Sequence, residues 1–243
     1  LTDFQGYASP VFSPDGSRIL FSNGTKDALY VISTKGGEWT QVVQSANCGH
    51  WPRWGASGET VEFRALGQRI SDVPAKAVSL DGSPVSAPRN RHSDGWVRIV
   101  EDQVHWTAGD ETIRVSPDGD RYCCAQRSLD GRWVLFQGVH TGLYLFDLTS
   151  RTLHPLGQGN HGRFDQQSDF LTYQNCEDDG QMITGCTFFL VDLNASNPLA
   201  MEIAGVSKDA RNPALAPSGD ALVFDMHGGI WMAPLVWSAR QAN

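Results

Sequence analysis

Clustered positive charge and long apolar runs are both missing from this sequence. Lys and Arg number 19 against 27 Asp and Glu, which gives a formal net charge of -8, and the basic residues are scattered. Nucleic-acid backbones and anionic membrane surfaces attract clustered positive charge, and a membrane-spanning helix requires roughly 18 or more consecutive apolar residues. We therefore expect no nucleic-acid partner and no insertion into a membrane.

Signals for helices and for common catalytic sites are missing as well. Gly and Pro interrupt nearly every window of helix length, and no apolar pattern persists at helical spacing. The sequence has no Gly-x-Ser-x-Gly elbow, phosphate-binding loop, dinucleotide fingerprint or His-Glu-x-x-His pair. The lack of any helical pattern indicates an all-β protein. The lack of common catalytic motifs favours a non-catalytic protein over an enzyme, and we assign no catalytic residue, metal or cofactor.

Cysteine is scarce, and one pair is well placed to bond. Cys176 and Cys186 flank the acidic segment 177–180, which is expected to be a hairpin loop between strands at 170–174 and 187–192. A small local disulfide is therefore predicted, with two buried free thiols as the alternative. Such a disulfide would place the chain in an oxidising compartment.

The pairing of the other three cysteines, Cys48, Cys123 and Cys124, stays open. A zinc site is disfavoured because the sequence has no Cys-x-x-Cys pair, and because adjacent cysteines cannot easily direct both sulfurs at one metal. The acidic segment 177–180 lacks the spacing of an EF-hand calcium loop and is read as a solvated hairpin tip.

What the sequence does contain is a turn that recurs in weakened copies. Each copy has an aromatic or apolar residue, a four-residue turn rich in Ser, Pro, Asp and Gly, and an alternating apolar strand. The copies lie at residues 12–21, 54–63, 128–136, 164–173 and 215–224. A divergent unit fits at 96–122. The implied period is about 40 residues, the length of one four-stranded propeller blade.

In the first copy the strands can be placed individually. Alternation and turn residues predict strands at 9–12, 18–23, 28–33 and 40–43. The turn Ser13-Pro14-Asp15-Gly16 joins the first two, because Pro presets φ, Asp accepts backbone hydrogen bonds and Gly tolerates positive φ.

Six such units account for nearly the whole chain. We predict one domain over residues 1–243, with blades at 7–44, 48–90, 94–122, 124–157, 160–204 and 209–237, the last including 1–5. The N-terminal segment is expected to complete the last blade and so to close an all-β, six-bladed β-propeller of four-stranded antiparallel blades. The alternative is that Leu235-Val236-Trp237 completes that blade.

The repeated residues resemble those of a known family. The aromatic-Ser-Pro-Asp-Gly turn is followed by an apolar strand and then by a strand of the type Leu29-Tyr30-Val31-Ile32, with similar strands at 143–148, 188–193 and 229–232. In these features the sequence resembles the TolB-like (WD-like, or WD40-like) six-bladed β-propeller family. That family includes periplasmic binding proteins, propellers attached to peptidases, kinases or regulators, and some lyases, so the resemblance implies a fold and leaves the function open.

Candidate ligand-binding residues precede or begin the first strand of several blades. In a propeller these segments meet at one mouth of the central channel. The candidates are His50, Trp51, Arg53, His161, Arg163, Arg211 and Asn212. Together they could bind a carboxylate, a peptide terminus or a sugar through charge-assisted hydrogen bonds and stacking. The alternative roles are packing between blades for the Trp and contact with channel water for the polar residues.

The sequence favours a non-catalytic scaffold for protein–protein interaction or for a peptide, small-molecule or glycan ligand at the channel mouth. The resemblance implies the sensor or interaction domain of a larger bacterial protein, or a periplasmic or secreted protein. One alternative is a carbohydrate-active propeller, either a lectin or a uronate lyase whose mouth histidines would hold a metal. Another is the regulatory propeller of an oligopeptidase.

Overall fold

The computed structural model describes residues 6–50, 52–63, 76–85 and 95–236, and every regular element in these ranges is a β-strand. The prediction of an all-β protein is therefore confirmed. Within the same ranges there is no helix with the length and apolar character needed to cross a membrane.

The strands form six antiparallel sheets that follow one another along the chain. Sheet 1 contains β1 (Tyr7–Phe12), β2 (Arg18–Asn23), β3 (Ala28–Ser33) and β4 (Thr40–Gln44). Sheet 2 contains β5 (Arg53–Trp54), β6 (Thr60–Phe63), β7 (Lys76–Ser79) and β8 (Pro84–Val85). Sheet 3 contains β9 (Trp96–Val100), β10 (Gln103–Ala108) and β11 (Glu111–Arg114).

The second half of the chain repeats this organisation. Sheet 4 contains β12 (Tyr122–Arg127), β13 (Trp133–Gly138), β14 (Gly142–Asp147) and β15 (Thr152–Gly157). Sheet 5 contains β16 (Asn160–Phe164), β17 (Phe170–Asp178), β18 (Ile183–Asp192) and β19 (Ala200–Ile203). Sheet 6 contains β20 (Arg211–Leu215), β21 (Ala221–Met226) and β22 (Gly229–Pro234).

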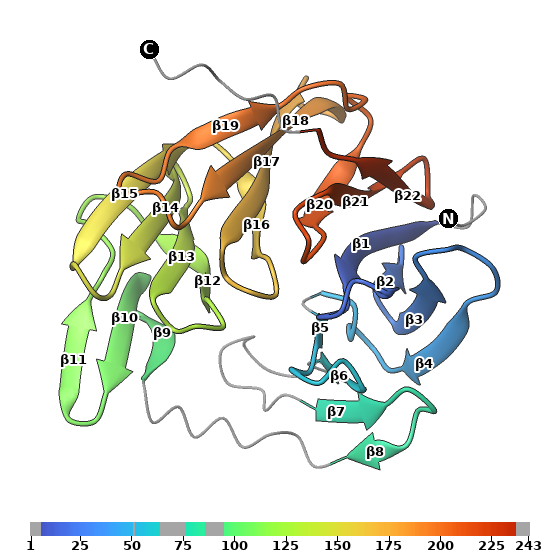
Figure 1. Cartoon of the computed structure of the whole chain (residues 1–243). Coiled ribbons are helices and arrows are strands. Elements are labelled where there is room, and N and C mark those ends of the chain that lie inside the picture. Colours follow the sequence, from blue (N-terminus) through green and yellow to red (C-terminus); the bar gives the residue numbers. More distant parts are fainter. Residues whose placement is uncertain (1–5, 51, 64–75, 86–94, 237–243) are drawn as a thin grey trace.

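The sheets are arranged about a common middle, with the first strand of each sheet nearest to it and the last strand farthest away (Figure 1). Apolar side chains fill the spaces between neighbouring sheets, because alternate residues of a strand point to opposite faces. Between sheets 1 and 2, for example, Leu20 and Leu29 pack in one cluster with Trp54 and Val61. The Trp54 indole also donates to the Val11 carbonyl over 3.1 Å.

Sheets 1 and 6 are neighbours although they lie at opposite ends of the sequence. Strand β1 contacts β20 and β21, and the Tyr7 amide donates to the Gly228 carbonyl over 2.7 Å. Phe21 of sheet 1 and Val223 of sheet 6 belong to the same buried cluster. The expected closing strand at 1–5 lies outside the described residues. Trp237 does too, and Leu235 and Val236 belong to no strand.

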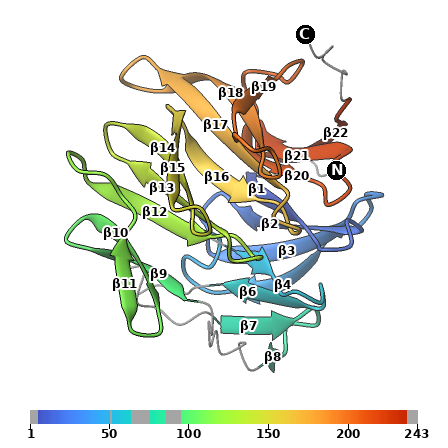
Figure 2. The ribbon, with the colours of Figure 1, turned by 60° about the vertical axis from the view of Figure 1, so that its left-hand side comes forward.

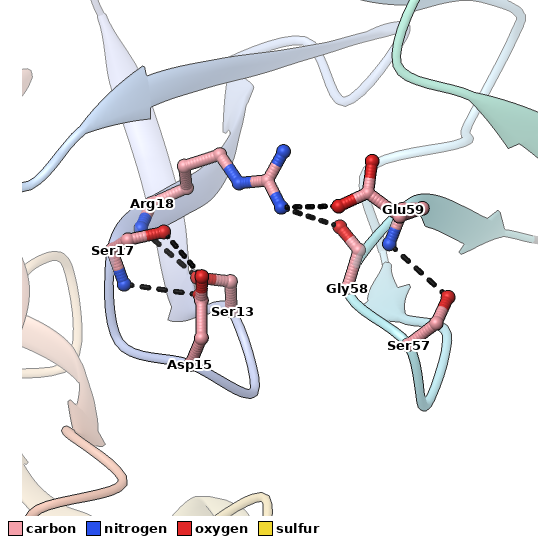
Figure 3. A network of polar contacts seen from close by, with 7 residues as sticks. All are labelled: Ser13, Asp15, Ser17, Arg18, Ser57, Gly58 and Glu59. Atoms are coloured by element: carbon pink, nitrogen blue, oxygen red, sulfur yellow. Dashed lines mark hydrogen bonds and ion pairs between the residues drawn. The ribbon is translucent and has the colours of Figure 1, made fainter.

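The turn at the start of the repeat is held by its aspartate. The Asp15 carboxylate accepts hydrogen bonds from Ser13 Oγ at 2.6 Å, Ser17 Oγ at 2.6 Å and the Ser17 amide at 3.1 Å (Figure 3). The Ser13 bond and the Ser17 bonds hold the pKa of Asp15 well below its usual value. The strands predicted at 18–23 and 28–33 are confirmed to the residue, and the first strand begins earlier than predicted, at Tyr7.

The same turn also joins two sheets. The Arg18 guanidinium donates to the Gly58 carbonyl over 2.9 Å and pairs with the Glu59 carboxylate at 3.1 Å (Figure 3). It also lies 5.4 Å from the centre of the Trp54 ring. The repeated turns of sheets 1 and 2 are therefore in direct contact.

The predicted disulfide between Cys176 and Cys186 is confirmed. The two residues face each other in the β17–β18 ladder, so they lie within the strands, which extend further than the sequence pattern predicted. These strands have 9 and 10 residues, against 6 in most of the equivalent strands. Their hairpin reaches past the neighbouring sheet (Figure 2).

The divergent third unit forms three strands, β9 to β11, in the described part of the chain. The residues expected to separate the third and fourth blades belong to sheet 4. Strand β12 begins at Tyr122, the last residue of the expected third blade, and includes Cys123.

Candidate functional site

Four inner strands carry a β-bulge at the same point of their ladders, in sheets 1, 4, 5 and 6. In each case two residues of the inner strand oppose one residue of the next strand. The first of the two has a positive φ, which is uncommon for a residue other than glycine. These bulge residues are Ser9 (φ 58°), Cys124 (57°), His161 (52°) and Asn212 (54°). Bulges redirect side chains and occur often beside functional sites.

Asp225 is the centre of a hydrogen-bond network around two of these bulges. It lies in β21 opposite Arg211, and it is buried. One carboxylate oxygen accepts the Ser9 amide over 2.9 Å and Asn212 Nδ2 over 2.8 Å. Burial raises the pKa of Asp225, and those hydrogen bonds together with the nearby positive charges oppose the increase.

Lys26 brings a positive charge to the same place from the β2–β3 turn. Its Nζ donates to Ser9 Oγ over 2.7 Å and to Ser22 Oγ over 3.1 Å. Burial lowers the pKa of Lys26 to about 8, with Asp225 opposing this change and Arg163 adding to it. The lysine is therefore held by neutral hydroxyl groups, with Asp225 as an electrostatic neighbour.

Arg163 of β16 supplies a second positive charge. It faces Thr172 in the ladder, and the Thr172 hydroxyl donates to the Pro213 carbonyl over 3.1 Å. Arg163 Nε is buried without a hydrogen-bond partner in the described residues. Burial lowers the pKa of Arg163 to about 10, while Asp225 acts in the opposite direction.

Arg53 in sheet 2 occupies the strand position that Arg163 occupies in sheet 5, but it has a charged partner. In sheet 2 it faces Glu62, just as Arg163 faces Thr172 in sheet 5. Arg53 and Glu62 form an ion pair at 2.7 Å, with the Glu62 side chain 7% exposed. Arg163 has no carboxylate in the corresponding place. Thr172, the residue opposite Arg163 in the ladder, therefore does not neutralise the charge of Arg163.

His161 lies beside Arg163 on the same strand. Burial lowers the pKa of His161, and the positive charges of Arg163 and Lys26 lower it further. Its side chain nevertheless keeps solvent-accessible surface. The surroundings therefore favour a neutral imidazole that remains open to a ligand.

Strands β16 and β20 each carry a buried side-chain oxygen that accepts no hydrogen bond in the described residues. Asn160 Oδ1 on β16 and Asn212 Oδ1 on β20 are buried without a hydrogen-bond partner among the described residues. Gln174 lies opposite Asn160, and its side-chain oxygen accepts the Asn212 amide over 2.6 Å. Buried polar atoms are usually paired, so unpaired ones here indicate a place for a polar ligand or water.

We call Ser9, Lys26, His161, Arg163, Asn212 and Asp225 the inner polar cluster. Three of its members, His161, Arg163 and Asn212, are among the residues predicted from the sequence. Sequence reasoning missed the other three. One signal was available for Asp225, since a polar residue follows an aromatic one in four second strands. These pairs are Phe21-Ser22, Phe136-Gln137, Tyr173-Gln174 and Phe224-Asp225.

The remaining predicted residues lie elsewhere or are engaged with other groups. Arg211 Nη1 donates to the carbonyls of Lys208 and Ala210, at 2.6 and 2.8 Å. His50 is exposed, and no contact joins it to the inner polar cluster in the described part of the chain. Arg53 is paired with Glu62. Trp51 lies outside the described residues.

No family model and no curated protein matches this sequence. The structure does have a counterpart, a TolB protein from Agrobacterium tumefaciens. The two superpose with a TM-score of 0.58 over 95% of this chain and 91% of that one, at 13% sequence identity. This chain has a TolB-like fold.

A second TolB protein, from Acinetobacter baumannii, matches with a TM-score of 0.43 and 14% identity, covering 97% of this chain and 56% of that one. The superposition on the Agrobacterium protein confirms, for the fold, the resemblance to TolB-like proteins predicted from the repeated turns. A likeness at 13% identity shows the fold alone, so the function has to be argued from the inner polar cluster itself.

Proposed function

We propose that this chain is a non-catalytic binding scaffold whose inner polar cluster receives an anionic group of a protein, peptide or small-molecule partner. The observation that carries the proposal is that no carboxylate lies opposite Arg163 in its ladder. Its strand position is the one at which Arg53 has Glu62 opposite, yet Arg163 faces the neutral Thr172. A carboxylate from a ligand would supply the missing partner through charge-assisted hydrogen bonds.

The charge distribution supports an anionic ligand. Arg163 contributes to the lowered pKa of Lys26. Asp225 is the carboxylate that opposes the lowering of the pKa values of both Lys26 and Arg163. The chain as a whole has a net charge of -8. A local excess of positive charge inside an acidic protein directs anions to that place and away from the rest of the surface.

We further propose that the six sheets form a closed six-bladed propeller over residues 1–243, with residues 1–5 completing sheet 6. The contact between β1 and the strands of sheet 6 supports closure. A closed ring would hold residues from sheets 1, 5 and 6 in place before the ligand arrives, which lowers the ordering cost of binding.

A thermal-shift experiment tests the anionic ligand. The whole chain is melted in acetate, succinate or inorganic phosphate, each compared with sodium chloride at equal ionic strength. A ligand that binds the folded state raises the melting temperature, by an amount that grows with the ratio of its concentration to its dissociation constant. We expect at least one anion to stabilise the wild type and the Arg53→Gln control, and to have no effect on Arg163→Gln.

Two outcomes would overturn the proposal. One is that no anion stabilises the wild type beyond sodium chloride. The other is that Arg163→Gln and Arg53→Gln respond to the anions alike, because the stabilisation would then come from general ionic effects.

The carbohydrate-active alternative has no specific support in the described residues. His50 and His161, the histidines considered as metal ligands, do not hold equivalent strand positions: His161 is a bulge residue of β16, whereas His50 lies before β5. We also propose a periplasmic or secreted location. The Cys176–Cys186 disulfide supports it, because such bonds persist in oxidising compartments.

A further inference from the structure

The inner polar cluster is exposed toward the end at which the inner strands begin. His161, the bulge residue near the start of β16, is exposed, and Arg163 is partly exposed. Asp165, the first residue after the same strand, is buried. The far end of β1 is closed as well, because Phe12 and Ser13 are almost fully buried. A ligand therefore meets the cluster from the side of His161.

At the far end of the inner strands, the turn after β16 contacts sheets on both sides of its own. Sheet 6 lies between sheets 5 and 1, since β20 contacts both β17 and β1. Gln166 of this turn nevertheless donates to the Phe12 carbonyl at the end of β1 over 3.4 Å. In the same turn, Ser168 Oγ accepts the amides of Leu129 and Asp130 over 3.0 and 3.3 Å. The turn after β16 therefore joins sheets 4, 5 and 1.

The corresponding turns of sheets 2 and 6 are joined to that of sheet 1. Arg18 donates to the Gly58 carbonyl over 2.9 Å, which links sheets 1 and 2 (Figure 3). A Cβ atom placed on Gly16 would lie 3.6 Å from Pro217 Cδ, so the turn of sheet 1 also touches that of sheet 6. We call the joined turns of sheets 1, 2, 4, 5 and 6 the floor of the cluster. A peptide that reaches the cluster from the side of His161 has these turns ahead of it.

The cluster offers a donor for a carboxylate and an acceptor for a neighbouring N–H group. Arg163 Nε has no hydrogen-bond partner among the described residues. Asn212 Nδ2 donates to the Asp225 carboxylate over 2.8 Å, so the amide oxygen of Asn212 is directed elsewhere, and it too is unpaired in the described part of the chain. Thr172, opposite Arg163, donates to the carbonyl of Pro213, the residue after Asn212. The unpaired donor and the unpaired acceptor therefore belong to directly connected strands.

We propose that the cluster receives the C-terminal carboxylate of a peptide or protein partner, an inference that rests on the anion site proposed above. The carboxylate pairs with Arg163 through charge-assisted hydrogen bonds, and the N–H of the partner's last residue donates to Asn212 Oδ1. Capture of a C-terminal carboxylate is an established mode of peptide recognition. A chain terminus brings one segment to the cluster and ends above the floor. An acidic side chain within a peptide must bring two segments through the same opening.

Two acetylated pentapeptides with the same single negative charge test this inference. One consists of glycine and has a free C-terminal carboxylate; the other has a central aspartate among glycines and an amidated C-terminus. The whole chain is melted with increasing amounts of each peptide at constant ionic strength, which gives the two dissociation constants. We expect the free-terminus peptide to bind at least about tenfold more tightly, the effect of one charge-assisted hydrogen bond. Arg163→Gln should lose this preference, and the control Arg53→Gln should keep it.

A third peptide tests the role of Asn212. It ends in sarcosine, so it keeps the terminal carboxylate but lacks the last N–H, and it should bind roughly fivefold more weakly than the all-glycine peptide. Equal binding of these two would remove Asn212 from the inference. The inference is wrong, and the anion site stands, if acetate stabilises the wild type but the free-terminus peptide binds no more tightly than the aspartate peptide. If acetate, succinate, phosphate and all the peptides fail to stabilise the wild type, the anion site itself is wrong.

Discussion

Asn212 donates a hydrogen bond from Nδ2 to the Asp225 carboxylate over 2.8 Å, and the oxygen that accepts it also accepts the Ser9 amide from sheet 1. Ser9 and Asp225 are 216 residues apart in the sequence. The buried carboxylate therefore joins the first and last sheets at the point where the inner polar cluster gathers. A ligand bound to this cluster would also contact the junction between the two sheets.

Replacement of Arg53 and of Arg163 by neutral Gln should have different effects on the free energy of unfolding. Arg53→Gln leaves the buried Glu62 carboxylate without its ion pair, so it should lower the free energy of unfolding by about 1–3 kcal/mol. Arg163→Gln removes a desolvated charge that has no ladder partner, so it should change that free energy by less than about 1 kcal/mol or raise it. Urea unfolding of both variants measures the difference. A larger loss for Arg163→Gln would mean that this arginine is a structural residue.

Lys26 should make the protein more stable as the solution becomes alkaline. Its pKa is about 8 in the folded state and 10.5 in the unfolded state. Between these values the folded state has released the proton that the unfolded state still binds, so the free energy of unfolding rises with pH, by a few kcal/mol at most.

Comparison with Lys26→Met isolates this contribution, because the other titrating groups are common to both proteins. The difference in free energy of unfolding, wild type minus variant, should be constant below about pH 8 and should increase above it. A difference that stays flat up to pH 10.5 would contradict the desolvation of Lys26.

The disulfide should stabilise the long hairpin by restricting the unfolded chain. Cys176 and Cys186 are separated by 10 residues, and closing a loop of that size is worth about 2–3 kcal/mol in the chain-entropy treatment. The double variant with Ser at both positions should lose about this much in urea unfolding. The wild type in reducing buffer should lose the same amount of unfolding free energy. If only the reduced wild type is destabilised and the double variant is not, the effect comes from cysteines other than Cys176 and Cys186.

Two short deletions test the proposed closure of sheet 6. If residues 1–5 complete this sheet, their removal exposes its last strand and should lower the free energy of unfolding by about 2 kcal/mol or more. If residues 237–243 take no part in that sheet, their removal should change the free energy of unfolding by less than about 0.5 kcal/mol. The reverse ranking would favour completion by the C-terminal segment.

Much of the local structure was predictable from the sequence because its causes are local. The Asp15 turn is made by side chains within five residues of one another, and the alternating strands on either side need only a buried face. The β17–β18 disulfide joins residues of a single hairpin for the same reason. Repetition of the turn then identified the TolB-like fold.

The bulges were harder to predict because a bulge is a property of two paired strands. Some traces of them are visible, since Pro10 and Pro213 follow the bulge residues Ser9 and Asn212, and proline within a sheet is confined to edges and bulges. Cys124 and His161 carry no such mark. Their positive φ values became visible only in the structure.

The sequence by itself determined the strands, the turns and the local disulfide, and it indicated His161, Arg163 and Asn212 as candidates. Only the tertiary structure showed that Lys26 and Asp225 join them, and that Arg163 lacks the partner that Arg53 has. The physical reason is that burial and charge neutralisation depend on residues that are distant in the chain, whereas turns and strand alternation depend on neighbours.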